Sequence, residues 1–157
     1  NRDVTIRDIV STYIYPNTLK TLCVTRAQLK CALERSAEYF AIDADGKLKV
    51  SESFLTPIEQ HFNYDYFSGI EAAFDIRRSV GDRVVSIKYK GEELSGDKRL
   101  TLCMNNYRAS GAGGYDIYRQ CQTVRELPTE IAELIIAYVD KHRNITVDKH
   151  KWLKLIY

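Results

Sequence analysis

The chain passes from a strand-like segment into a glycine-rich loop at Arg99-Leu100-Thr101-Leu102-Cys103-Met104-Asn105-Asn106-Tyr107-Arg108-Ala109-Ser110-Gly111-Ala112-Gly113-Gly114-Tyr115-Asp116. Residues 99–104 have the near-alternating, β-favouring composition of a strand, so the polar residues that follow are expected at a sheet edge. The glycines allow backbone conformations closed to other residues and a close approach to a ligand. Tyr107 would then offer a flat face for stacking on a base. The alternative interpretation is a glycine turn with Tyr107 and Tyr115 packed over it.

Outward from this loop, capping signals and hydrophobic spacing predict helices that start at Thr5 and Thr25 and a long helix from Glu130 to about His142, opened by Pro128-Thr129. The second helix carries an apolar stripe at helical spacing, which indicates a core-facing surface: Leu29, Ala32, Leu33, Ala37 and Phe40. Strands are expected at 18–24, 70–76, 84–89 and 100–104, and an edge strand at 149–157. The turns after 76 and 89 predict that 70–76, 84–89 and 100–104 form one antiparallel meander.

Composition places the chain among ordinary globular proteins. Its 157 residues are close to the length of one domain, with 45% hydrophobic and 28% charged residues. No apolar run is long enough to span a bilayer. A net charge of +2 is too small for general binding to a nucleic-acid polymer, so any nucleic-acid chemistry would concern single nucleotides. Eleven tyrosines favour ligand contact, because each combines a flat apolar face with a hydroxyl.

The chain offers no convincing catalytic or metal-binding motif. Its four cysteines have no metal-ligand spacing, and we expect free thiols, with Cys23 and Cys103 buried in strands. Asp43 and Asp45 resemble the start of a calcium loop, but no glutamate follows at the twelfth position. No DxH, HxxH or GxSxG pattern occurs, so we expect neither catalytic residues nor a metal site in this chain. The first residues carry no signal-peptide pattern, and we expect the chain to be part of a longer protein.

Unusual residues gather in three loops, each beside an expected strand. These loops are Tyr15-Pro16-Asn17, Phe62-Asn63-Tyr64-Asp65 and Asn106-Tyr107. One edge of a sheet would bring all three together. Two facing tyrosines would then hold a flat heterocycle, and amide side chains would satisfy the donors and acceptors at its rim. The pattern is that of a nucleobase clamp.

At these residues the sequence resembles a known family. The shared motifs are Tyr15-Pro16-Asn17-Thr18-Leu19, Ala27-Gln28-Leu29 after Val24-Thr25, Phe62-Asn63-Tyr64-Asp65 with Gly69, and 105–111. Together they resemble the C-terminal domain of the 5′-nucleotidase family, in particular the bacterial 2′,3′-cyclic-nucleotide 2′-phosphodiesterase/3′-nucleotidase branch. The resemblance covers nearly the whole chain. It implies an α+β fold, a mixed β-sheet with helices packed on it, formed by a single domain over residues 1–157.

The resemblance also implies a division of labour. A separate N-terminal metallophosphoesterase domain, absent from this chain, would carry two divalent metal ions and the catalytic residues. The present chain would form the domain that holds the nucleoside or nucleotide, with Tyr15 and Tyr107 around the base and Asn17 in contact with the base. From the second loop, Asn63 is the further candidate for substrate binding. The longer protein that contains both domains would be an extracellular, cell-wall or periplasmic hydrolase.

Two departures from the family pattern bear on the site. Some members carry an aspartate where this chain has Gly113, so a ribose or base contact is lost or supplied by Asp116. Family arginines that contact substrate lie upstream of this chain. Arg108 is expected to be a surface ion-pair partner, and the alternative is that it substitutes for those arginines. Two other functions stay open: an adhesion or scaffold module that binds glycans or proteins, and a self-sufficient enzyme that uses Asp65 or His61. The base preference and the position of the phosphate also stay open.

Overall fold

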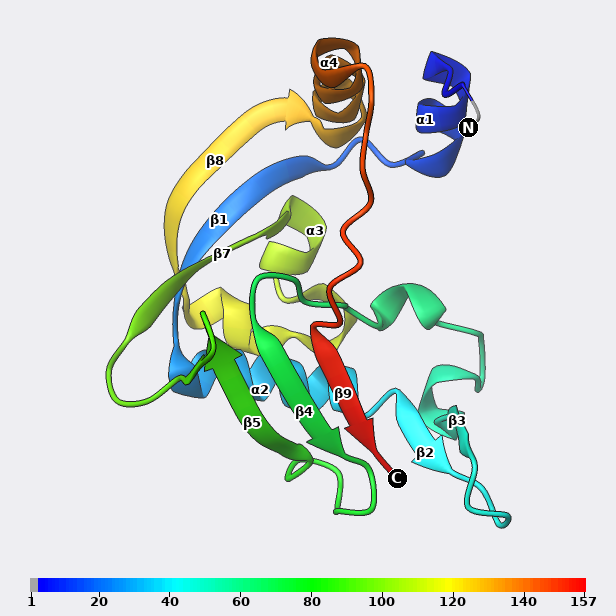
Figure 1. Ribbon diagram of the computed structural model, residues 1–157, viewed down its shortest axis with the longest axis vertical. Coiled ribbons are helices and arrows are strands. Elements are labelled where there is room, and N and C mark those ends of the chain that lie inside the picture. Colours follow the sequence, from blue (N-terminus) through cyan, green and yellow to red (C-terminus); the bar gives the residue numbers. More distant parts are fainter. Residues whose placement is uncertain (1–2) are drawn as a thin grey trace.

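The computed structural model describes residues 3–157, in which four α-helices pack with three β-sheets (Figure 1). The elements in chain order are α1 (Ile6–Thr12), β1 (Thr18–Thr25), α2 (Arg26–Ala37), β2 (Phe40–Ile42), β3 (Leu48–Val50), β4 (Glu71–Asp75), β5 (Val84–Tyr89), β6 (Glu92–Glu93), β7 (Arg99–Asn105), α3 (Asn106–Ala109), β8 (Gln122–Glu130), α4 (Ile131–His142) and β9 (Leu153–Ile156). The expected α+β class is confirmed. Helices and strands both contribute to one core, centred on α2 and the strands around it.

The first sheet has the order β7-β1-β8, with both neighbours antiparallel to β1. Leu22 pairs with Leu102 and Val24 with Leu100, so apolar side chains stand opposite each other on the core face. The antiparallel pair of the predicted meander is confirmed as β4 and β5. Its third strand was wrong, because residues 100–104 pair with β1 and not with β5. After β5 the chain turns into the two-residue β6, which takes the edge of the other sheet. The alternating pattern also leaves Cys103 exposed, contrary to expectation.

The second sheet has the order β6-β5-β4-β9 and is mixed, since β9 runs parallel to β4. The expected C-terminal edge strand is confirmed, although it is shorter than 149–157. Residues 40–50 form the β2–β3 hairpin. Phe40 begins β2 and does not extend the helical stripe, because α2 ends at Ala37.

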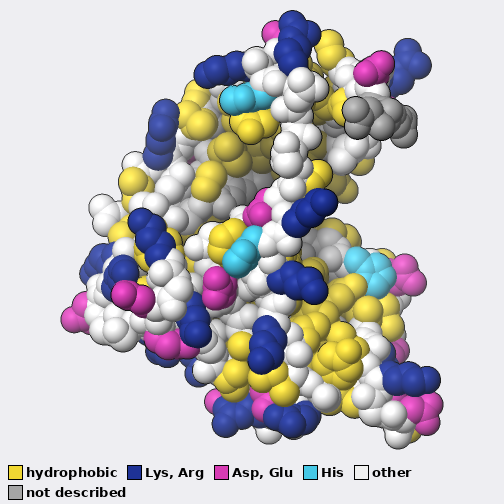
Figure 2. Space-filling view, in the orientation of Figure 1, with side chains coloured by type: hydrophobic (Ala, Val, Ile, Leu, Met, Phe, Trp, Pro, Cys, Tyr) yellow, Lys and Arg dark blue, Asp and Glu magenta, His cyan; other side chains and the backbone are white. Residues whose placement is uncertain are grey.

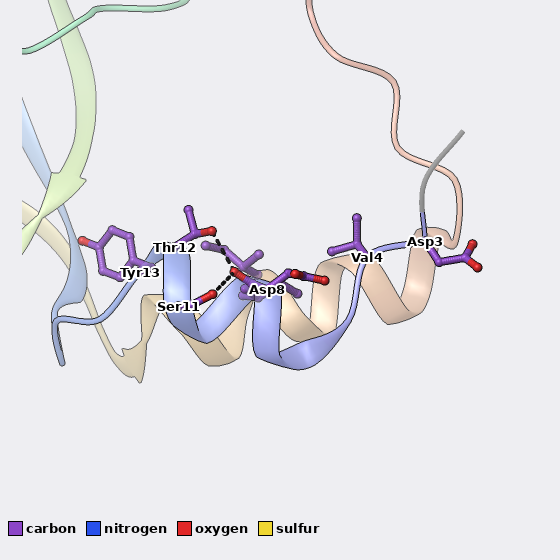
Figure 3. A pocket seen from close by; sticks show the side chains of 8 residues that line it. Asp3, Val4, Asp8, Ser11, Thr12 and Tyr13 are labelled. Carbon is purple, nitrogen blue, oxygen red and sulfur yellow. Dashed lines mark hydrogen bonds between the residues drawn. The ribbon is translucent and has the colours of Figure 1, made fainter.

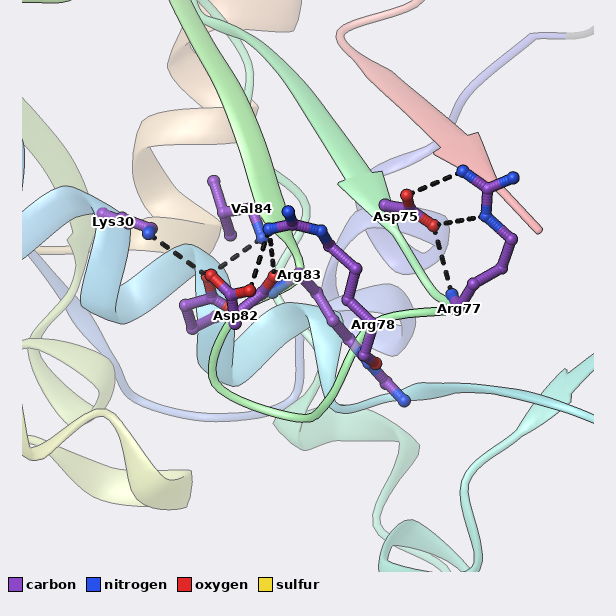
Figure 4. Close-up of polar contacts among 8 residues, drawn as sticks. Lys30, Asp75, Arg77, Arg78, Asp82, Arg83 and Val84 are labelled. Atoms are coloured by element: carbon purple, nitrogen blue, oxygen red, sulfur yellow. Dashed lines mark hydrogen bonds and ion pairs between the residues drawn. The ribbon is translucent and has the colours of Figure 1, made fainter.

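Helix α2 lies against both sheets and begins with the predicted capping box between Thr25 and Gln28. Its apolar stripe is buried. The same helix contributes a buried carboxylate, because Glu34 accepts hydrogen bonds from the backbone N–H groups of Arg83 and Val84, both at 2.9 Å. Figure 4 shows these contacts at the start of β5. They join α2 to the second sheet.

Helices α1 and α4 lie side by side at one end of the molecule (Figure 1). The helix expected from Glu130 to about His142 is confirmed as α4, with Glu130 as its N-cap. Pro128 does not open it, since this residue lies in β8. Proline is tolerated there because β8 is an edge strand. A connector then runs from α4 to β9 across a hollow in the surface (Figure 2). None of the helices described in residues 3–157 has the length and hydropathy needed to cross a bilayer.

Candidate functional site

Two of the three unusual loops meet at the end of the β1–β7 pair. Residues 15–17 lead into β1 and residues 106–107 follow β7, and antiparallel pairing brings the start of one strand beside the end of the other. The backbone N–H of Thr18 donates to Oδ1 of Asn106 at 3.1 Å. The hydroxyl of Tyr13 accepts from the amide groups of Asn17 and Asn105, each at 3.4 Å.

The third loop joins them through Arg108. Its Nη2 donates to the backbone oxygen of Phe62 at 3.0 Å, and its Nε lies 2.8 Å from Oδ2 of Asp65. All three segments therefore contribute to one region of the molecule, although they are far apart in the sequence.

The two candidate ring residues lie at the surface of this region. Tyr15 is 65% exposed and Tyr107 is 47% exposed, so both rings have free area for a ligand. Tyr107 stands on α3, a single turn whose N-cap is Asn105, with its side chain accepting from the backbone N–H of Arg108 at 2.6 Å. An exposed aromatic ring on a fixed turn is the arrangement that a stacking site requires.

The two candidate asparagines differ in position. Asn17 is half-buried, and its backbone oxygen accepts from the N–H of Ile131 at the start of α4. Asn63 is buried behind the loop surface, with its Nδ2 donating to Oε1 of Gln60 at 2.8 Å. Within residues 3–157 the Oδ1 of Asn63 has no hydrogen-bond partner. Contact of either side chain with a ligand stays a prediction.

Arg108 is not at the surface, contrary to the sequence interpretation. It is 5% exposed, and besides its contacts with Phe62 and Asp65 it donates through Nη1 to the backbone oxygen of Ala112. Its guanidinium also lies 4.4 Å from the ring centroid of Tyr115. Burial raises the pKa of Asp65 above its ordinary value, although Arg108 acts in the opposite direction. Arginine is suited to this position because its planar fork can serve several acceptors at once.

The Tyr115 hydroxyl completes the network behind the loops. It shares a hydrogen bond of 2.7 Å with Oγ of Ser36 on α2, and it accepts from the N–H of Asp65 at 3.1 Å. It also donates to the backbone oxygen of Asn63 at 3.3 Å. Tyr118 stacks on Tyr115 with ring centroids 5.7 Å apart. Burial raises the pKa of Tyr115 to about 12, so its hydroxyl stays protonated at neutral pH.

The glycine loop approaches other side chains closely. Gly113 has a φ of 73°, and a Cβ at this position would clash with Nη1 of Arg108 and with Oδ1 of Asn63. An aspartate at this position would have no room in this chain. Asp116 instead pairs with Arg119 at the surface.

Two cavities lie near the gathered loops. One of about 290 Å³ is lined by residues 64–68 and 102–105 together with Arg108 and Tyr118. A larger one, of about 430 Å³, lies between α1 and α4 and includes Tyr13 and Ile135 (Figure 3). The smaller cavity is lined by Asp65 and Arg108 of the polar network, so we place the candidate site there. In residues 3–157, no cluster of three or more His, Cys, Asp or Glu side chains has a geometry for binding a metal ion.

The chain has a mixed α+β fold, with two exposed tyrosine rings in loops beside the β1–β7 strand pair. Comparison with known proteins identifies its family. The model of the 5′-nucleotidase C-terminal domain matches residues 1–120. The chain belongs to this family.

Relatives agree with this assignment. The Trifunctional nucleotide phosphoesterase protein YfkN of Bacillus subtilis is 23% identical over 155 residues, which cover 91% of this chain and 10% of that protein. A 2′,3′-cyclic-nucleotide 2′-phosphodiesterase/3′-nucleotidase of Haemophilus influenzae is 30% identical over 125 residues, covering 69% of this chain and 18% of that protein.

A solved structure also matches. It is a protein from Staphylococcus aureus assigned as a 5′-nucleotidase, in complex with alpha-ketoglutarate, with a TM-score of 0.90 and 38% identity. The match covers 98% of this chain and 30% of that one. The chain thus spans less than a third of the length of these relatives.

Proposed function

We propose that this chain is the nucleoside-binding domain of a metal-dependent nucleotide phosphohydrolase and that it holds the base between Tyr15 and Tyr107. The observation that carries the proposal is the hydrogen bond from the backbone N–H of Thr18 to Asn106. It joins the two loops that bear these exposed rings at the points where they meet β1 and β7. Membership of the nucleotidase family supplies the ligand class.

The chemistry of the site fits a nucleoside better than a phosphate. The rings offer apolar faces, and Asn17 offers both a donor and an acceptor at their edge. Arg108 is buried and already bonded to Asp65 and to two backbone oxygens, so it is not available as an anion receptor. Phosphate recognition and catalysis would therefore belong to the N-terminal metallophosphoesterase domain, where two divalent metal ions would activate water.

The parent would be a secreted or cell-surface hydrolase that degrades nucleotides, with either 5′- or cyclic and 3′-phosphate specificity. Domain closure would carry the bound nucleoside to the metal ions. In this scheme the present chain sets the base contacts and the partner domain sets the phosphate contacts.

Calorimetric titration with adenosine tests the proposal. Tyr107→Ala removes one stacking face, worth about 1–3 kcal/mol, so adenosine should bind roughly 5- to 150-fold more weakly. Tyr138→Ala is the matched control, because Tyr138 is 55% exposed and lies on α4, outside the three loops. An affinity that Tyr107→Ala leaves unchanged would reject the clamp. Saturable binding of sugars in place of nucleosides would favour the adhesion module.

A further inference from the structure

Three arginines converge on the glycine loop from different parts of the chain. Each donates one hydrogen bond to a backbone oxygen of the loop: Arg119 Nε to Ser110 at 3.0 Å, Arg108 Nη1 to Ala112, and Arg35 Nε to Gly113 at 3.0 Å. Arg35 comes from α2, Arg108 from α3 and Arg119 from the turn of 3₁₀ helix at Asp116–Gln120.

In each case the residue after the acceptor is a glycine, and the arginine fills the space that a side chain would need. A Cβ on Gly111 would lie 2.7 Å from Nε of Arg119, and one on Gly114 would lie 2.5 Å from Nε of Arg35. A Cβ on Gly113 would likewise clash with Nη1 of Arg108. The loop is thus glycine-rich at the positions where the arginines approach the backbone, which differs from the ligand approach that the sequence suggested.

Each of these arginines is paired with a carboxylate. Arg108 pairs with Asp65, Arg119 with Asp116 at 3.2 Å, and Arg35 with Glu38. Arg35 also lies over the ring of Phe54, with its Cζ 4.5 Å from the ring centroid. A guanidinium that is already paired and bonded to backbone oxygen has little capacity left for a ligand anion. The arrangement is therefore suited to holding the loop in one conformation.

This loop determines the position of Tyr107. Helix α3 has only four residues, and a single turn of helix is not stable by itself. Arg108 follows Tyr107 directly, and its Cζ lies 5.8 Å from the Tyr107 ring centroid. The contacts of Arg108 with Phe62, Asp65 and Ala112 therefore fix the turn that presents the ring.

We propose that Arg108, supported by Arg35 and Arg119, is a positioning residue of the binding site: the three arginines hold the glycine loop and so place Tyr107 before a ligand arrives. The inference rests on the proposed function for its ligand, but the order of the loop can be measured without one. Preorganisation of this kind raises affinity because less conformational freedom is lost on binding.

The test compares Arg108→Lys with Arg83→Lys. Arg83 is a matched control, since it is also buried, at 9% exposed, and donates to the backbone oxygens of Arg78, Ala37 and Phe40. It lies at the contact between α2 and β5 (Figure 4). A lysine keeps the charge at either position but cannot reproduce the fork. Both variants should lower the melting temperature.

Two measurements on the folded protein separate the variants. Amide hydrogen exchange over residues 106–115 should accelerate more than tenfold in Arg108→Lys and stay unchanged in Arg83→Lys. Adenosine affinity, measured by calorimetry well below the melting temperature, should fall at least tenfold in Arg108→Lys alone. Equal behaviour of the two variants in exchange would overturn the inference. If the unchanged protein fails to bind adenosine, the proposed function fails, and the exchange data still decide the role of the arginines.

A second pair of variants covers the case in which Arg108→Lys does not fold. Gly113→Ala displaces Arg108 while it keeps every charge, whereas Gly46→Ala imposes a similar backbone strain in open space. Gly46 has a φ of 79° and no atom within 4 Å of a built Cβ, so it controls for the strain alone. Gly113→Ala should accelerate exchange over 106–115 and weaken adenosine binding about tenfold, and Gly46→Ala should do neither. No difference between the two in loop exchange would also overturn the inference.

Discussion

Two buried ion-rich regions of this molecule are built alike but have different surroundings. We name them the Glu34 anchor (Glu34 and Arg83) and the Asp65 anchor (Asp65 and Arg108). In both, a buried arginine donates to backbone oxygens of segments far apart in the sequence. The Glu34 carboxylate accepts from backbone N–H groups, whereas the Asp65 carboxylate pairs with the Arg108 side chain. The Glu34 anchor joins α2 to the second sheet, whereas the Asp65 anchor holds loops that carry exposed tyrosines.

The comparison shows that a buried charge by itself does not mark a functional site. Both anchors satisfy buried polar groups that would otherwise be costly. What distinguishes the Asp65 anchor is the exposed ring of Tyr107 directly beside it in the chain. We therefore expect damage to the Glu34 anchor to affect stability alone, and damage to the Asp65 anchor to affect both stability and ligand binding.

The largest effect is expected for Glu34→Ala. The change leaves the backbone N–H groups of Arg83 and Val84 without an acceptor, and each such buried group costs about 1–3 kcal/mol. We expect the free energy of unfolding, measured by urea denaturation, to fall by about 3 kcal/mol. The exposed Glu133 on α4 provides a control, because Glu133→Ala should change it by less than about 0.5 kcal/mol. A change in the adenosine affinity of folded Glu34→Ala would break the comparison.

Tyr115→Phe tests the Asp65 anchor with a smaller change. The lost hydroxyl binds Ser36, Asp65 and Asn63, so three buried or half-buried groups lose a partner. We expect about 1–2 kcal/mol of lost stability together with weaker adenosine binding.

The control for this variant is Tyr118→Phe, because the Tyr118 ring stacks on Tyr115 but its hydroxyl makes none of these bonds. Both variants keep an aromatic ring in place. If Tyr115→Phe lowered stability but left adenosine affinity intact, the Asp65 anchor would be no more than a second structural region.

Local features of the sequence were sufficient to predict much of the fold. The Thr25–Gln28 capping box and the stripe of α2 depend on residues close in sequence, and both are present. The partner of β7 was missed, because strand pairing between β1 and β7 depends on contacts about 80 residues apart, and the turns after β5 gave no information about it.

In the site, too, features that depend on nearby residues were predicted and contacts between distant residues were missed. The loops of Tyr15 and Tyr107 were selected for their unusual residues beside expected strands, and the family resemblance assigned the two tyrosines as the ring pair. The structure leaves both exposed. The burial of Arg108 was missed, since an arginine in a polar loop ordinarily faces solvent. The roles of Arg35 and Arg119 were missed as well. The one available signal was the row of glycines at 111, 113 and 114, which was interpreted as space for a ligand but accommodates these arginines.

The smallest effect on stability is expected at alkaline pH, where the tyrosines around the Asp65 anchor lose their protons. Burial raises the pKa of Tyr64 from 10.0 to about 12, and Tyr115 shows a shift in the same direction and to the same value. The unfolded chain therefore loses these protons at lower pH than the folded protein, and the stabilising contribution, full below pH 10, declines as the pH rises toward about 12.

Melting temperatures recorded between about pH 9 and 12, the range in which tyrosine hydroxyls lose their protons, measure this decline. Tyr64→Phe should lessen the slope of this decline, because it removes one of the three tyrosines, with Tyr115 and Tyr118, whose pKa burial raises. Tyr157→Phe, at an exposed residue, should leave the curve unchanged. Hydrogen exchange at pH 11 sharpens the comparison further. Protection should be lost first over the loops of the Asp65 anchor and later at the Glu34 anchor, which contains no tyrosine. Loss of protection in the reverse order, or a slope that Tyr64→Phe does not alter, would contradict the assignment of the alkaline transition to this region.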